Sequence, residues 1–163
     1  MNRQTKSSLL LIFISSVFLL FSSCSATMKI HNRKNFKILK ETPIVIQIQN
    51  RDMLNAEPML RNELLMNGYN VISANEFRKY SSKTLRGNNS NLYYPQIILL
   101  RVDYSIWVNY STFNIFNVEI VDFKSEEIIS IAYYNQNVNN AFFAAPTNSV
   151  IKKFVKGFEE LVE

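Results

Sequence analysis

The sequence predicts an α+β domain, a two-layer sandwich in which two or three helices pack on a mainly antiparallel sheet of about four to five strands. Three observations support this fold class. Residues 96–108 alternate apolar and polar side chains over the length of a long strand. Two more alternating segments, 114–123 and 127–136, follow after short turns, which is typical of an antiparallel meander. Residues 151–162 carry an apolar stripe at helical spacing that should pack on the sheet.

The first part of the domain supplies one strand and two helices. Alternating isoleucines predict a strand over residues 42–50. A helix is expected over residues 56–67, with Gly68 just past its end, where the backbone becomes left-handed. Ser73 and Glu76 match a capping box, in which each side chain accepts a hydrogen bond from the other residue's backbone amide. They predict a second, short helix.

The apolar positions of the three later strands indicate which side of the sheet is buried. Within residues 96–108, the even-numbered positions from Ile98 to Val108 are all apolar or aromatic. The odd-numbered positions are apolar only at the start, at Ile97 and Leu99, so helices or loops should cover both faces at that end. In the hairpin, the expected apolar sets are Phe116, Val118 and Ile120, then Ile129, Ile131 and Tyr133.

The order of elements over roughly residues 42–162 resembles that of small domains of the bacterial cell envelope. These are the domains related to the amino-terminal domain of the Tol translocation protein and to penicillin-binding-protein activator lipoproteins. The resemblance implies a shared architecture. It assigns no binding residue, because a fold alone does not carry function.

The amino-terminal segment has the three-part order of a secretory signal. Arg3 and Lys6 form a positive start, residues 9–21 form an apolar stretch, and two small serines precede Cys24. This segment resembles the bacterial lipoprotein signal family, whose lipobox ends in a cysteine. Phe21 stands where that family usually has leucine.

The lipoprotein resemblance implies that residues 1–23 are removed and that Cys24 receives lipid on its sulfur. Two or three acyl chains hold a protein on a bilayer essentially permanently. Cys24 is the only cysteine, so no intramolecular disulfide forms. The domain is then expected outside the cytoplasm. Ser25 is not the aspartate that retains some lipoproteins at the inner membrane, which favours the outer membrane.

Two other interpretations of the amino terminus stay open. Residues 7–23 form an apolar run of 17 residues that would be an uncleaved anchor, although a helix that spans a bilayer needs about 20. An ordinary signal would be cut elsewhere, for example after Ala26. Residues 24–41, which contain five basic side chains, are expected to be a tether, either solvated or resting on anionic headgroups. A short strand near 36–39 ends this tether, and one domain follows over residues 42–163.

Composition and charge limit the classes of function. The chain has 163 residues, 47% of them hydrophobic, which supports a folded domain. Without Arg3 and Lys6, the 18 basic residues fall to 16 against 13 acidic ones, a net charge of +3. The basic residues form no stripe of the kind that nucleic-acid binding requires. The expected partners are therefore a membrane, through the lipid on Cys24, and an envelope protein, and no nucleic acid.

The sequence contains no recognisable catalytic set. Metal sites need clustered ligands, whereas His31 is the only histidine and Cys24 is assigned to lipid. A serine nucleophile would lack a histidine base near the expected core. Three glycines are too few for a phosphate-binding loop. We therefore predict no catalytic residue, no metal site and no cofactor, and expect that the protein is not an enzyme.

Exposed aromatic side chains are the first candidates for contact with a partner or ligand. They are Trp107 and Tyr110 near the end of the long strand, and Phe142 and Phe143 in the loop before the last helix. The alternative is that each packs under a helix or loop. A weaker candidate is the strand face that carries Arg101, Asp103 and Glu119. Its alternative is an ordinary polar surface with an ion pair.

Two functions fit these features. The first is a non-catalytic envelope lipoprotein that acts as a membrane-anchored interaction or accessory module. The second is a lipid-anchored protein that binds or hydrolyses cell-wall or surface glycan. Glycan cleavage would require two carboxylates that flank a cleft, such as Asp103 and Glu119. A structure without a cleft at these residues would argue against the second function.

Overall fold

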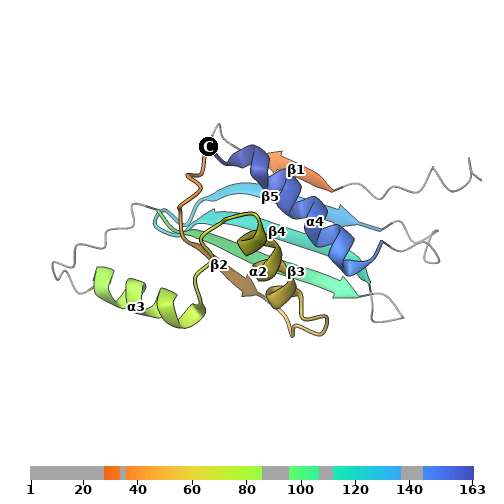
Figure 1. Ribbon diagram of the computed structural model, residues 1–163, viewed down its shortest axis with the longest axis horizontal. Coiled ribbons are helices and arrows are strands. Elements are labelled where there is room, and N and C mark those ends of the chain that lie inside the picture. Colours follow the sequence, from red (N-terminus) through yellow and green to blue (C-terminus); the bar gives the residue numbers. More distant parts are fainter. Residues whose placement is uncertain (1–27, 34–35, 86–95, 107–111, 137–144) are drawn as a thin grey trace, which may run out of the picture.

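The computed structural model describes residues 28–33, 36–85, 96–106, 112–136 and 145–163, and it confirms the α+β fold (Figure 1). The strands are β1 (Lys29–Asn32), β2 (Ile44–Ile48), β3 (Ile98–Ile106), β4 (Phe113–Asp122) and β5 (Ile128–Asn135). The helices are α2 (Ala56–Met66), α3 (Ala74–Leu85), α4 (Thr147–Phe158) and the short 3-10 helix η2 (Glu159–Leu161).

The five strands form one sheet in the order β1-β5-β4-β3-β2. The strands β3, β4 and β5 make the antiparallel meander that the sequence predicts. The first strand of the predicted domain, β2, lies parallel to β3, so the sheet is mixed and mainly antiparallel. Gly68, just past α2, has the left-handed backbone expected of it, with φ 80°.

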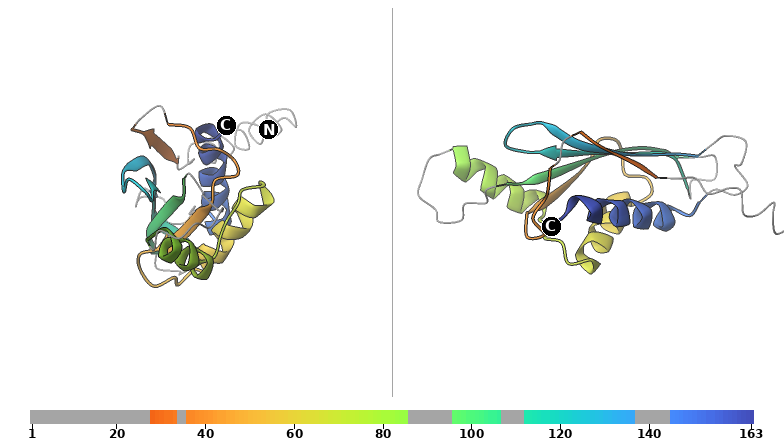
Figure 2. Two further views of the ribbon diagram at one scale, coloured as in Figure 1. Left: turned by 90° about the vertical axis from the view of Figure 1, so that its left-hand side faces the viewer. Right: turned by 90° about the horizontal axis from the view of Figure 1, so that it is seen from above.

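The main core lies between one face of the sheet and the helices α2 and α4 (Figure 2). The apolar stripe of α4 is buried as predicted, except that Val162 lies beyond the helix and bridges to Ile38. Rings from α4 and the sheet meet edge to face, with the centroids of Phe116 and Phe154 6.1 Å apart. Each fully buried side chain of this size contributes about 1.5–3 kcal/mol to folding. This face therefore holds the domain together.

The opposite face of the sheet is covered only at one end. Val45, Leu99 and Val121 form a second, small apolar cluster there, with Phe77 of α3 packed on it. The apolar start of β3 is thus covered on both sides, as its sequence predicts. The rest of this face carries no helix (Figure 2).

The apolar set expected for β5 is wrong beyond its first residue. Ser130 pairs with Ile120 while Ile128 pairs with Val121, so Ile129 is the extra residue of a β-bulge. The bulge shifts the alternation that follows. As a result Ser130, Ala132 and Tyr134 are buried towards the helices, and Ile131 and Tyr133 point to the other face.

The tether expected over residues 24–41 is also wrong for its described part. Residues 29–32 form the edge strand β1, which pairs with β5. Ile38 is buried, and its amide donates a hydrogen bond to the carbonyl of Leu161. A Cβ atom on Gly157 of α4 would lie 2.3 Å from Cδ1 of Ile30, so helix and edge strand are in close contact. The folded domain therefore begins near residue 28.

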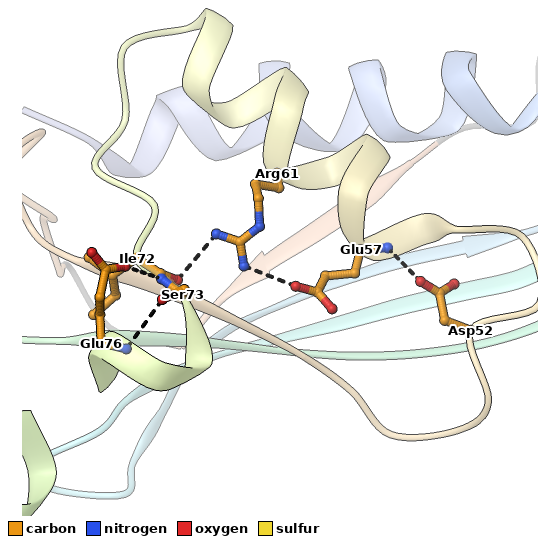
Figure 3. A network of polar contacts seen from close by, with 6 residues as sticks. All are labelled: Asp52, Glu57, Arg61, Ile72, Ser73 and Glu76. Carbon is orange, nitrogen blue, oxygen red and sulfur yellow. Dashed lines mark hydrogen bonds and ion pairs between the residues drawn. The ribbon is translucent and has the colours of Figure 1, made fainter. Parts of the chain in front are cut away.

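Polar contacts fix the starts of α2 and α3 and link α2 to the segment before α3 (Figure 3). The Asp52 carboxylate accepts hydrogen bonds from the amides of Ala56 and Glu57 and so caps α2. Arg61 links Glu57 to the Ile72 carbonyl. The predicted capping box starts α3: the Ser73 amide donates to Glu76, which lowers the pKa of that carboxyl. The helix then runs to residue 85, longer than expected.

Replacing Gly157 with alanine tests the contact between β1 and α4. The added methyl group collides with Ile30, so Gly157→Ala should lower the free energy of unfolding by about 1–3 kcal/mol, even though alanine favours helix. In an Ile30→Val background the colliding carbon is absent, and most of this loss should disappear. Urea unfolding of the four chains measures the difference. An equal loss in both backgrounds would contradict the packing of β1 on α4.

Candidate functional site

The part of the sheet that carries no helix presents an ordered set of polar and aromatic side chains, which we call the open face. Two cross-strand rows form it, and the register of the sheet sets their members. Row one consists of Gln47, Arg101, Glu119, Ile131 and His31, and row two of Asp103, Asn117, Tyr133 and Lys29.

The weaker candidate face of the sequence lies within these rows. Arg101 and Glu119 are directly opposite on β3 and β4, with Nη1 and Oε2 4.0 Å apart. Asp103 lies two residues further along β3 and accepts a hydrogen bond from the side chain of Asn50. The structure therefore brings Arg101, Asp103 and Glu119 onto one surface. An ion pair this exposed adds about 0–1 kcal/mol to stability, so the pair is not needed for folding.

Asn117 is the polar group of the open face that most needs an explanation. Its Oδ1 atom is buried and has no hydrogen-bond partner among the described residues. Buried polar atoms are nearly always bonded, because an unsatisfied acceptor costs about 1–3 kcal/mol.

Tyr133 supplies the aromatic ring of the open face. It lies directly opposite Asn117 and is 38% exposed, whereas its neighbour Tyr134 is fully buried. Tyrosine offers a large rigid contact area with a polar end, which makes it frequent where proteins meet partners. Sequence reasoning placed Tyr133 in the core because the bulge at Ile129 leaves no trace in the apolar pattern.

The other candidates of the sequence fall outside the part of the chain that the structure describes. They are the four aromatic side chains and the lipid attachment residue: Trp107, Tyr110, Phe142, Phe143 and Cys24.

The described residues contain no group of three or more side chains that would hold a metal ion. A hollow lies elsewhere, on α4, and it is lined by three lysines together with Pro146, Asn148 and Ser149. Asp103 and Glu119 lie on an open sheet surface, with partners in Asn50 and Arg101. Within the described ranges, no helix has the length and apolar character needed to cross a bilayer.

Two adjacent tyrosines of β5, one buried and one exposed, test which side of the strand faces the core. Tyr134→Ala removes a fully buried ring and should lower the free energy of unfolding by about 3–5 kcal/mol. Tyr133→Ala changes an outward strand position and should cost about 1 kcal/mol or less. Thermal unfolding of both variants measures the contrast. Equal losses of unfolding free energy, or a larger loss for Tyr133→Ala, would contradict the assignment of Tyr134 to the core and of Tyr133 to the surface.

Comparisons with known proteins give similarity at the level of structure. No protein-family model matches the chain, and no curated protein matches it. Among solved structures, the chain is similar to a PelC dodecamer from Paraburkholderia phytofirmans, with 13% identity, a TM-score of 0.45, and coverage of 78% of this chain and 96% of that one. A PelC variant dodecamer from the same organism gives 14% identity and a TM-score of 0.42, with 77% and 90% covered.

Proposed function

We propose that this protein is a non-catalytic accessory lipoprotein of the bacterial cell envelope. In this proposal, lipid on Cys24 holds the domain at a membrane, outside the cytoplasm, and the open face binds a protein partner. Ser25 favours the outer membrane as the site of attachment.

The observation that carries the proposal is the unequal covering of the sheet. One face is buried under α2 and α4, while the other carries Asp103, Asn117 and Tyr133 in one row, of which Asp103 and Tyr133 are exposed. Small molecules usually bind in concave pockets, whereas protein partners bind broad surfaces of about 800 Å² on each side. A broad sheet face with an exposed ring, Tyr133, and an exposed carboxylate, Asp103, therefore favours a protein partner.

The carboxylates of the open face support recognition over catalysis. Glu119 faces the Arg101 guanidinium, and Asp103 accepts a hydrogen bond from Asn50. A retaining or inverting glycosidase needs two acids on opposite sides of a bound sugar. Since Asp103 and Glu119 lie on neighbouring strands of the same flat surface, we assign them to partner contact.

A surface glycan is the second candidate ligand. The exposed ring of Tyr133 offers a flat apolar surface on which a sugar stacks, and Asn117 and Asp103 beside it offer hydrogen-bonding groups. Here too the open face binds and does not react. The two candidates differ in the molecule that cross-links to this face.

The anchor is tested by replacing the lipid attachment residue. Cells fed a labelled fatty acid should incorporate the label into the native protein, and Cys24→Ala should abolish this labelling, because no other cysteine is present. The Cys24→Ala chain should also leave the membrane fraction. Label retained by Cys24→Ala would overturn the anchor.

Partner binding is tested with a photo-crosslinking amino acid placed at Tyr133 in intact cells. We expect a discrete protein adduct that disappears when Asp103 and Asn117 are also changed to alanine. The matched control places the crosslinker at Glu160, an exposed residue of η2, where the same adduct should be absent.

Three other results would count against a protein partner at the open face. No adduct at Tyr133, or the same adduct at both positions, would contradict it. A glycan adduct at Tyr133 would replace the protein partner with the second candidate.

A further inference from the structure

The helices α2 and α4 form one layer, and the side of this layer that points away from the sheet, the outer helix side, has its own chemical character (Figure 2). On α4 it presents Lys152 and Lys156, which are exposed and lie one helical turn apart. Together with Lys153, Asn148 and Ser149 they line an open hollow along the helix.

Positive charge is concentrated at this edge of the molecule. Residues 128–158 contain three lysines and no acidic residue, and residues 25–40 contain five basic residues and no acidic one. The two segments are neighbours in space, because Gly157 of α4 meets Ile30 of β1. The exposed Glu159 and Glu160 follow directly after α4, so the cationic part of this edge is the stretch of α4 that carries Lys152 and Lys156. A cationic stretch of this kind attracts an anionic partner.

Apolar side chains accompany these cations. Six large apolar side chains are exposed among the described residues, and four of them belong to α2 or to the turns beside it: Leu39, Met53, Leu65 and Met66. Met66 is 82% exposed. The turn that holds Leu39 lies against the end of α2, since Lys40 approaches Gly68 and the ring of Tyr69. Cations mixed with exposed apolar groups suit a membrane interface better than a soluble anion.

The short chain between Cys24 and β1 would keep the domain near the bilayer that holds the lipid. Met28 packs against the main core, so the domain starts four residues after Cys24. Four residues span at most about 14 Å when fully extended. Electrostatic attraction acts over about 8–10 Å at physiological salt. A lipid on Cys24 therefore holds the domain within reach of the charged headgroups.

We propose that the outer helix side lies on the membrane that holds Cys24, with anionic phospholipid headgroups bound at Lys152 and Lys156 and with Leu65 and Met66 in the interface. This inference rests on the proposed anchor and adds an orientation to it. The open face lies on the other side of the sheet from these helices. In this orientation it points away from the bilayer, towards a partner.

The test uses the full lipidated chain in vesicles that contain lipids with quencher-bearing headgroups. A single cysteine, Asn148→Cys on α4 or Ser105→Cys on the open face, carries a fluorescent label, because the sulfur of Cys24 is occupied by lipid. Both positions are exposed in the free domain. In vesicles of phosphatidylcholine with phosphatidylglycerol, we expect strong quenching at residue 148 and little at residue 105. In phosphatidylcholine alone, quenching at residue 148 should fall.

Charge reversal identifies the residues responsible. Each of Lys152→Glu and Lys156→Glu should lower the ratio of docked to undocked domain at least about five-fold, which corresponds to about 1 kcal/mol per lysine. The matched control, Lys124→Glu in the β4–β5 turn, makes the same change of charge elsewhere and should leave the ratio unchanged. High salt should also lower the ratio of docked to undocked domain, because it screens the attraction between the lysines and the headgroups.

The outcomes separate this inference from the anchor. Protein that floats with the vesicles but shows equal quenching at both positions, or quenching insensitive to the lysines, overturns the orientation and leaves the anchor intact. Protein that does not float overturns both. A cross-link between two copies through residue 148 would assign the outer helix side to self-association and would likewise overturn membrane docking.

Discussion

The close packing of α4 on the sheet is the constraint on which the rest of the structure depends. Small side chains make it possible: Ser130 and Ala132 lie beneath the helix layer, and Gly157 lets β1 approach the helix. Close-packed interiors tolerate little change in volume, so these small residues determine which side of β5 faces the helices. Because Ala132 faces inwards, Tyr133 faces outwards, and the open face follows from the core.

The two sides of the molecule then have different chemistry for the same reason. The helices bury their apolar residues against the sheet. Their charged and long side chains, such as Lys152 and Lys156, therefore lie on the outside. A sheet that buries one face leaves alternate residues on the other, and here these include Arg101 and Asn117.

Sequence reasoning succeeded where a pattern repeats within one element and failed where the structure depends on distant residues. Periodicity predicted β3, the meander and the stripe of α4 because a helix or strand with one buried face must repeat its apolar residues. The choice of inward-facing residues in β5 was wrong after Ile129, because a bulge at that position adds one residue and shifts the alternation. Strand β1 has only four residues and pairs with a strand about a hundred positions later, so no local pattern marks it. Arg101, Asp103 and Glu119 were correctly placed on one face, whereas Tyr133 was assigned to the core.

The pairing of the first described residues with the last has a consequence for the order of folding. Strand β1 pairs with β5, and Ile38 contacts Leu161 and Val162. The amino-terminal part of the domain therefore cannot reach its native position before the carboxy-terminal part has been made available. Contacts so far apart in sequence make folding slow. A chain that is threaded through a membrane with its amino end leading cannot complete this sheet until β5 has emerged, and it cannot form the contacts of Ile38 until Leu161 and Val162 have followed. Such a domain stays open to chaperones throughout its passage and becomes resistant to proteases only when translocation is complete.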